Sequence, residues 1–188
     1  MSQHVYTAMR ALENWHAALE DVYGPVVVDA MDIPSFQGRF SRNGSPALPC
    51  GIVGSNVQRV RQGVAPHDRA NSSRVFLVAN LAGNAVLKCG ERSLTFAPGD
   101  CTLVDPGMPW DFRFSDPFQH LSVHLPRSIL DLHPDGPAES VLHAFPASSL
   151  LARSLITLSR LIIFERSRCG VVEEVSLRDS LVSLVAGG

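Results

Sequence analysis

The stretch APGDCTLVDPGMPWDFRF, residues 97–114, decides the fold of this 188-residue chain. It contains a Pro-Gly-Asp turn, a short apolar segment, a Pro-Gly-x-Pro turn, and then a segment in which aromatic and charged residues alternate. Proline and glycine at these positions favour tight turns, and strict alternation indicates a strand with one buried side. The stretch therefore predicts two short strands joined by tight turns, which is typical of β-barrels.

The same texture extends over residues 26–125, where short β-rich segments are separated by Gly, Pro, Asn and Asp. About nine strands are expected from this pattern. Their sequences are VVVDA, FQGRF, GIVGSNVQRV, VFLVANLAG, AVLKCG, SLTFA, CTLVD, WDFRF and FQHLSVHL. Turn signals at this spacing predict an all-β sandwich or barrel, and we expect a jelly-roll barrel of the double-stranded β-helix type.

Helices are predicted on both sides of the barrel. An amphipathic helix over residues 7–23 follows from five residues at helical spacing: Ala8, Leu12, Trp15, Leu19 and Val22. Residues 149–166 predict a long helix, and SLRDSLVSLVAG predicts another that begins at Ser176 and ends at Gly187. The expected fold is mainly β with flanking helices, in a single domain that ends in a helical region over residues 126–188.

Composition excludes several classes of protein. Hydrophobic residues make up 45% and charged residues 18%, which excludes a disordered chain, and no aliphatic run is long enough to span a bilayer. The N-terminus has no secretory signal, so a cytoplasmic location is expected. The net charge is −2 and there is no basic run, so we do not expect this chain itself to bind DNA. The widely spaced cysteines predict buried, reduced thiols: Cys50, Cys89, Cys101 and Cys169.

A metal site is not expected. Metal-dependent cupin enzymes usually combine a His-x-His and a Glu on one strand with a further His on a later strand. Here Trp110 follows Pro109, and the segment before the FLVANLAG strand contains His67 alone. His120 and His124 lie four residues apart on a predicted strand, a separation of about 13 Å, so they cannot share one ion. We expect these two histidines on the solvent-facing side, and no metal or cofactor.

Signatures of covalent catalysis are also missing from the sequence. It has no Gly-x-Ser-x-Gly motif, no glycine-rich phosphate loop and no cysteine near a histidine in a known pattern. We therefore assign no catalytic residue and do not expect an enzyme. An acid/base pair assembled only in the folded chain stays open as an alternative.

Aromatic residues supply the candidate ligand pocket. Trp110, Phe112 and Phe114 share one face of their strand, and Leu121 and Val123 form the matching face of the next. Most of these residues are expected to be barrel core. Trp110, at the end of a strand beside a turn, is placed to stack on a ligand at the barrel mouth. The hypothetical pocket therefore comprises all five residues.

The long helix over residues 149–166 carries two apolar faces, although packing on one body requires only one. Leu151, Leu155, Leu158 and Ile162 have the spacing of a coiled-coil seam. We predict that these four residues form a homodimer interface with an antiparallel copy of the same helix, with Glu165 as a partner for its arginines. The alternative is that both faces are buried within one subunit.

A series of turn and strand motifs follows in a fixed order between residues 72 and 130. The motifs are the Gly83 turn, Gly90 with Glu91, Pro98 to Asp100, Asp105 with Pro106, Pro109 before an aromatic residue, Phe114, Asp116 to Phe118, and Leu125 to Arg127. Together with NWHAALEDVYGPVVV and FQGRFS upstream, they resemble the N-terminal sensor domain of AraC/XylS-type bacterial transcription regulators, in the subgroup with a Trp-containing N-terminal helix.

The resemblance implies a cupin-like barrel that binds a small organic effector, helices that dimerise, and a further DNA-binding domain with two helix-turn-helix motifs. The chain ends where a domain of about a hundred further residues would follow. We therefore expect the regulatory half of such a regulator, which contacts DNA only through the missing domain. Two alternatives remain open from the residues alone: a metal-independent cupin-type isomerase or lyase, and a ligand-free dimerisation scaffold.

Overall fold

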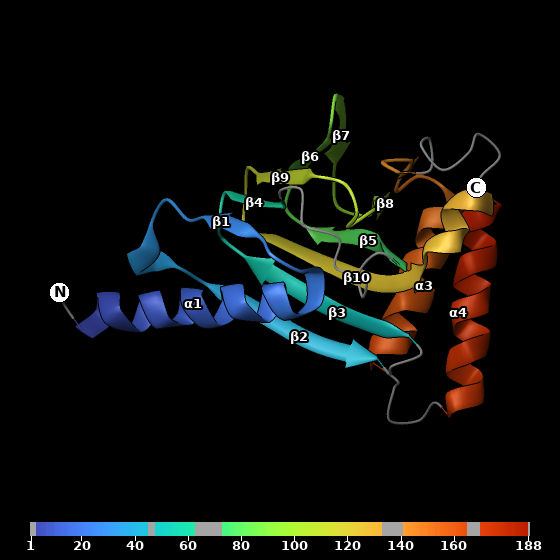
Figure 1. Ribbon diagram of the computed structural model, residues 1–188, viewed down its shortest axis with the longest axis horizontal. Coiled ribbons are helices and arrows are strands. Elements are labelled where there is room, and N and C mark those ends of the chain that lie inside the picture. The colour runs from blue at the N-terminus through green and yellow to red at the C-terminus, as the bar shows by residue number, and fades with distance from the viewer. Residues whose placement is uncertain (1–2, 45–47, 63–72, 133–140, 165–169, 188) are drawn as a thin grey trace.

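Two antiparallel sheets face each other in the computed structural model, which describes residues 3–44, 48–62, 73–132, 141–164 and 170–187 (Figure 1). In spatial order, the smaller sheet consists of β1 (Val27–Asp29), β4 (Arg59–Gln62), β9 (Trp110–Phe114), β6 (Ala85–Cys89) and β7 (Arg92–Phe96). The larger sheet consists of β11 (Ala144–Phe145), β8 (Cys101–Val104), β5 (Arg74–Ala82), β10 (Phe118–Pro126), β3 (Pro49–Ser55) and β2 (Gly38–Gly44). This arrangement confirms the predicted jelly-roll class.

The helical elements flank the two sheets. They are α1 (Gln3–Tyr23), α3 (Leu150–Phe164) and α4 (Val171–Ala186), together with two 3-10 helices, η1 (Ile33–Ser35) and η2 (Arg127–Leu132). The predicted start of the last helix at Ser176 is wrong. Gly170 precedes the first turn and its N–H donates to the Glu173 carboxylate at 2.8 Å, so the helix begins five residues earlier.

The turn at residues 105–109 carries the chain from one sheet to the other, because β8 lies in the larger sheet and β9 in the smaller. Asp105 holds this turn. One of its carboxylate oxygens accepts the Gly107 N–H at 2.8 Å, and the other accepts Arg127 Nη2 at 2.6 Å. Both strands predicted from this stretch are present.

Helix α1 closes the side of the barrel where β1 and β2 form the free edges of the two sheets. The Trp15 indole N–H donates to the Arg39 carbonyl of β2 at 3.3 Å, and His16 Nε2 donates to the Val26 carbonyl, just before β1, at 2.8 Å. Arg42 of β2 pairs with Asp21 at 2.6 Å. The helix is therefore bonded to both sheets rather than lying on one.

Helix α3 crosses the outer face of the larger sheet. It contacts β8 near one side of that sheet and β2 at the opposite edge, and Cys101 Sγ of β8 lies 3.8 Å from the Ala152 carbonyl. Helix α4 packs beside α3 and also contacts η2 (Figure 1). The larger sheet is consequently buried on both faces, one towards the barrel interior and one beneath the C-terminal helices.

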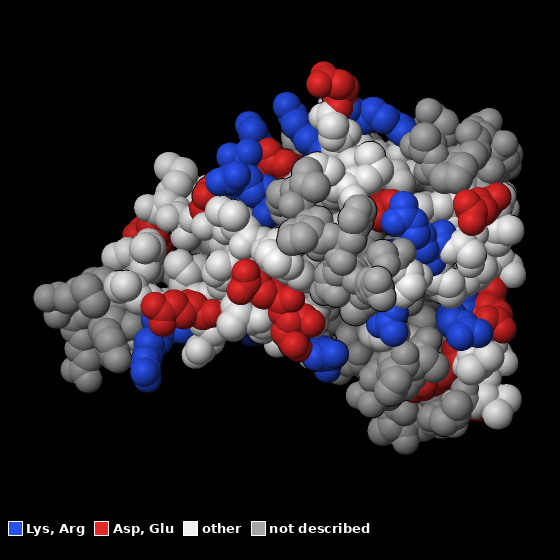
Figure 2. Space-filling model, in the orientation of Figure 1, with Lys and Arg blue, Asp and Glu red and all other residues white. Residues whose placement is uncertain are grey.

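The outer face of the smaller sheet carries alternating charges. Arg59 makes a two-pronged contact with Asp111 at 2.8 and 2.7 Å, which lowers the pKa of that carboxyl, and Arg113 lies 3.2 Å from the same group. On the face shown in Figure 2, basic and acidic side chains lie side by side over this sheet. Within the described part of the chain, no helix is both long and apolar enough to cross a membrane.

Candidate functional site

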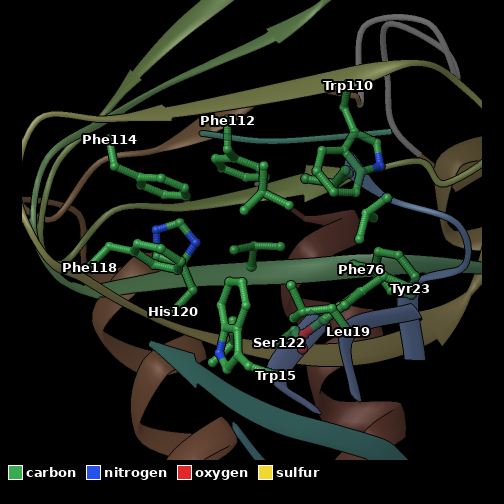
Figure 3. Close-up of a pocket in the computed structure, with 15 residues that line it drawn as sticks. Trp15, Leu19, Tyr23, Phe76, Trp110, Phe112, Phe114, Phe118, His120 and Ser122 are labelled. Atoms are coloured by element: carbon green, nitrogen blue, oxygen red, sulfur yellow. Dashed lines mark hydrogen bonds between the residues drawn. The ribbon is translucent and has the colours of Figure 1, made fainter. Parts of the chain in front are cut away.

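A cavity of about 60 Å³ lies inside the barrel, between the two sheets and beneath α1 (Figure 3). Eight elements or their ends contribute to its walls. The lining residues are Trp15, Leu19, Tyr23, Val26, Val53, Val60, Phe76, Val78, Val104, Trp110, Phe112, Phe114, Phe118, His120 and Ser122. Aromatic rings dominate this wall, and no charged side chain is found among the described residues that line it.

Helix α1 supplies one wall of the cavity. Trp15, Leu19 and Tyr23 recur every four residues and therefore share one helix face. The Phe36 and Trp15 rings both pack against Gly38, where an added Cβ would overlap the Phe36 ring and come within 2.8 Å of the indole. Glycine at this position allows the helix to approach β2 closely enough for Trp15 to reach the interior.

Strand β9 supplies the opposite wall. Trp110, Phe112 and Phe114 point inward, while Asp111 and Arg113 face outward, as the alternation predicted. Successive rings are in contact, with centroids 5.7 Å apart for Trp110 and Phe112 and 5.9 Å apart for Phe112 and Phe114. Trp110 is 6% exposed, so it lies inside the barrel rather than at an open mouth.

On strand β10 the predicted faces are reversed. His120 and Ser122 line the cavity, whereas Leu121 and Val123 lie on the opposite face and are 0% exposed. Both faces of this strand are buried, so hydrophobicity does not distinguish the inward one. The expectation that Leu121 and Val123 face the same space as Trp110 is wrong. Their place is in the layer between the sheet and the helices.

His120 sits in a cage of four phenylalanine rings. Its ring centroid is 5.0 to 5.5 Å from those of Phe96, Phe112, Phe114 and Phe118. Burial lowers the pKa of His120 to about 3, so the imidazole is neutral at physiological pH. Its Nε2 atom has no hydrogen-bond partner among the described residues. The prediction that His120 is solvent-facing is wrong.

Two further buried polar groups are found at the Trp110 end: Trp110 lines the cavity, and its cross-strand neighbour Gln62 is not among the lining residues. The Trp110 indole N–H is buried and has no partner in the described part of the chain. Gln62 stands directly opposite Trp110 in the β4–β9 pairing. Its Nε2 donates to the Tyr23 carbonyl at 3.2 Å, which leaves the buried Oε1 as an acceptor that no described group satisfies.

Tyr23 and Ser122 form the one direct hydrogen bond between described polar side chains of the cavity wall, at 2.6 Å. Burial raises the pKa of the Tyr23 phenol to about 12, so it is neutral. This bond joins the last residue of α1 to the middle of β10. It therefore connects the helix to the cavity floor.

His124 lies on the same side of β10 but beyond the cavity, where its ring centroid is 4.5 Å from that of Phe76. Burial, reinforced by the positive charges of Arg74 and Arg42, lowers its pKa to about 4. It is 7% exposed, so the prediction that it is solvent-facing is also wrong. The two histidines occupy separate environments.

Metal ligands do not converge in the described parts of the chain. No group of three or more His, Cys, Asp or Glu side chains there is arranged to hold an ion. His67 and Cys169 lie outside the described residues. Cys50, Cys89 and Cys101 are buried thiols, and burial raises the pKa of Cys101 to about 12, which makes it a poor nucleophile.

The four residues predicted as a dimer seam do not form one exposed stripe. Leu155 and Ile162 are 0% and 3% exposed and belong to the core of the single chain, whereas Leu151 and Leu158 are half-buried. The exposed apolar side chains of α3 are Leu150, Leu161 and Phe164. Glu165, named as a partner across the seam, lies outside the described residues.

Comparisons with known proteins identify a matching domain family and a similar fold. The sequence profile of the AraC-binding-like domain matches residues 15–187. The crystal structure of the AraC-like transcriptional activator CuxR superposes with a TM-score of 0.72 at 14% identity, covering 94% of this chain and 64% of that one. An uncharacterized protein in the nit 5′ region of Bacillus sp. (strain OxB-1) is 26% identical over 116 residues, which are 62% of this chain and 45% of that protein. The chain thus spans less than two thirds of either relative.

Proposed function

We propose that this chain, which belongs to the AraC-binding-like domain family, is the effector-sensing and dimerisation domain of a transcription regulator. The observation that carries the proposal is an interior apolar cavity whose wall contains two buried polar atoms, Trp110 Nε1 and His120 Nε2, that no described group satisfies. Unsatisfied buried polar atoms are costly, and a ligand that bonds to them offsets that cost. Such a cavity is built for binding.

Binding is favoured over catalysis by the chemistry of the wall. Neither the lowered pKa of His120 nor the raised pKa of Tyr23 lies near neutrality, where a general acid or base works best. No described carboxylate, lysine or cysteine lines the cavity. In this proposal the effector is bound and released unchanged.

The proposed response runs through α1. At about 60 Å³ the cavity is smaller than the roughly 300 Å³ at which pockets for drug-sized ligands begin. An effector therefore has to displace wall side chains, and three of these belong to α1. Because this helix is bonded to both sheets, its displacement is a change that the rest of a regulator can detect.

The chain is a homodimer in this proposal, with the interface moved from the predicted seam to the exposed side of α3. Leu150, Leu161 and Phe164 are 77%, 45% and 66% exposed and lie on one side of the helix. A dimer would hold two DNA-binding domains at a fixed separation. DNA contact is assigned to a domain outside these 188 residues, because the net charge of −2 offers no phosphate-binding surface.

Blocking the cavity tests the sensing function. Val78 lines the cavity, so Val78→Phe should fill it, while Val86→Phe makes the same change at an exposed position of β6. In the complete regulator with a promoter reporter, Val78→Phe should abolish the response to whichever culture condition induces the wild type, and Val86→Phe should retain it. Equal induction of both variants, with both folded by circular dichroism, would refute sensing through this cavity.

Sedimentation tests the dimer. Leu161→Glu with Phe164→Glu should convert the chain to a folded monomer, whereas Met31→Glu, a change at a residue 84% exposed outside α3, should leave it dimeric. A wild-type chain that is monomeric at about 50 μM, a concentration above typical dimer affinities, would refute the dimer proposal. That result would leave the cavity proposal untouched.

A further inference from the structure

We infer that the effector is an uncharged, planar and largely apolar molecule with a hydrogen-bonding group at each end, one held by Trp110 and the other by His120. This inference rests on the proposed function, since it names the chemical class that the cavity selects. Figure 3 shows Trp110 and His120 at opposite ends of the cavity, with Phe112 between them. The two unsatisfied atoms, Trp110 Nε1 and His120 Nε2, therefore define where the two polar ends of the effector bind.

The absence of charge on the effector follows from the wall. No acidic or basic side chain is present among the described lining residues, and both His120 and Tyr23 are neutral. Moving an unpaired ion into such a site costs several kcal/mol even after relaxation. Phosphates, carboxylates and ammonium compounds are accordingly disfavoured.

The apolar character of the effector follows from the small number of polar groups in the cavity wall. Five lining side chains carry polar atoms. The Trp15 indole already donates to the Arg39 carbonyl, and Tyr23 and Ser122 bond to each other at 2.6 Å, which leaves Trp110 and His120. A sugar brings several hydroxyls that each need a partner once they are buried. Two remaining partners at the ends of an aromatic slot suit a molecule with two polar groups and a hydrocarbon centre.

The group at the Trp110 end must accept a hydrogen bond, because an indole nitrogen only donates. Gln62, the cross-strand neighbour of Trp110, is not among the present lining residues, but its buried Oε1 is an acceptor that no described group satisfies, and the bond from Nε2 to the Tyr23 carbonyl holds the side chain. A donor and an acceptor on neighbouring residues match a group that both accepts and donates. A carboxamide has this pattern, and a carboxylate does not.

The planar shape follows from the aromatic rings. Phe112 and Phe114 are parallel within 1°, and Phe114 and Phe118 within 7° with centroids 3.7 Å apart. Parallel rings present a flat wall on which another ring stacks. The His120 imidazole lies 5.0 to 5.5 Å from these three rings and either donates or accepts according to its tautomer, so a phenolic hydroxyl is a suitable second group for it.

A probe series tests this chemistry by fluorescence. The chain has two tryptophans, Trp15 and Trp110, and both line the cavity, so emission reports directly on it. We would titrate 4-hydroxybenzamide, 4-hydroxybenzoate, toluene and arabinose at pH 7. The neutral amide should change the emission and bind at least about tenfold more tightly than the benzoate, because that ratio corresponds to 1.4 kcal/mol and charge burial costs more. Arabinose should not bind.

Single substitutions then distinguish the contribution of each hydrogen bond to probe affinity from the contribution of apolar burial. Trp110→Phe keeps an aromatic ring but removes the donor, so the amide should bind about fivefold more weakly, the loss of one hydrogen bond, while toluene binding should be unchanged. His120→Phe should act likewise on the phenol end. Trp15 remains as the reporter in both variants.

Two results overturn the inference. Tighter binding of the benzoate or of arabinose than of the amide would show that the cavity takes another class of effector, with the proposed sensing function intact. Failure of all four probes to change emission at millimolar concentration would also overturn it. The proposed sensing function itself fails only if Val78→Phe leaves induction of the complete regulator unchanged.

Discussion

Strands β9 and β10 follow each other in the chain and both line the cavity, yet their second faces differ. The outer face of β9 meets water and carries Asp111 and Arg113, whereas the outer face of β10 lies beneath the C-terminal helices and carries Leu121, Val123 and Leu125, each 0% exposed. On β9 the apolar residues face the cavity. On β10 the most apolar residues face away from it.

The difference between the two strands shows which property of a strand is revealed by alternating apolar and polar residues. A strand with one wet face separates apolar from polar residues, so its inward side is evident from the sequence. A strand that is buried on both faces has no wet side, and its two faces contact two different buried environments. On β10 one side packs tightly against helices, and the other keeps His120 and Ser122 available to the cavity.

The largest expected effect of a single substitution is on the helix-covered face of β10. Leu121→Ala should lower the free energy of unfolding by about 2–5 kcal/mol, because it leaves a void in a fully packed layer. Urea denaturation measures this. The matched change Val86→Ala on the exposed face of β6 should cost less than about 0.5 kcal/mol. Similar losses for the two variants would mean that the layer under the helices is loosely packed.

Acid should also weaken the fold strongly, through the histidines on the inner side of β10. Their folded pKa values, about 3 for His120 and about 4 for His124, lie below the ordinary 6.5. The unfolded chain therefore binds more protons below pH 6.5, and stability falls as the pH drops towards these values. The expected loss is about 1.4 kcal/mol per pH unit for each histidine.

His120→Phe separates the two contributions. Urea denaturation at pH 7, 6, 5 and 4 should show a slope reduced by about 1.4 kcal/mol per pH unit in this variant, because of the two buried histidines only His124 still contributes. An unchanged slope would contradict the buried, neutral state of His120. Solvent exposure of the imidazole would be the direct explanation of that outcome.

The hydrogen bond between α1 and β10 should have a smaller effect. Tyr23→Phe or Ser122→Ala alone should each cost about 1 kcal/mol, because one partner is left buried and unsatisfied. The double variant should cost less than the sum of the two, since both polar groups are then removed. Additive losses would show that the 2.6 Å contact between the hydroxyls makes no coupled contribution to stability.

The smallest effect is expected on the wet face of β9. Arg113→Gln should change the free energy of unfolding by less than about 0.5 kcal/mol, because its side chain is 53% exposed and its contact with Asp111 is screened by solvent. Thermal unfolding in low and high salt measures it. A loss comparable with that of Leu121→Ala would mean that the two faces compared above are not energetically distinct.

Much of the fold was predictable because its signals are local. The turns at Gly99 and Gly107 punctuate residues 97–114 clearly, and the alternation on β9 correctly identified Trp110, Phe112 and Phe114 as inward-facing. Helix α1 followed from apolar spacing that ends at Gly24. On β9 and over residues 8–23 of α1, the large apolar residues are buried or half-buried and the charged residues face outward, so the residue type reveals the environment.

The rest depended on contacts between distant segments. Trp15 and Tyr23 looked like one apolar helix face, and nothing local revealed that this face opens onto a cavity. His120 and Ser122 were hidden because both sides of β10 are buried. The His-x-Ser-x-His alternation in a strand of otherwise apolar residues was the available signal. For Leu155 and Ile162, heptad spacing does not distinguish a partner subunit from the sheet of the same chain.

The attachment of α1 to both sheets has a consequence for aggregation. Edge strands offer unpaired backbone groups to other chains, and β1 and β2 are such edges. The Trp15 indole occupies the Arg39 carbonyl of β2, and the His16 imidazole occupies the Val26 carbonyl beside β1. A form of the protein that lacked this helix would present two open sheet edges next to an uncovered aromatic slot. The helix that covers the cavity therefore also keeps neighbouring molecules from adding strands to the two sheets.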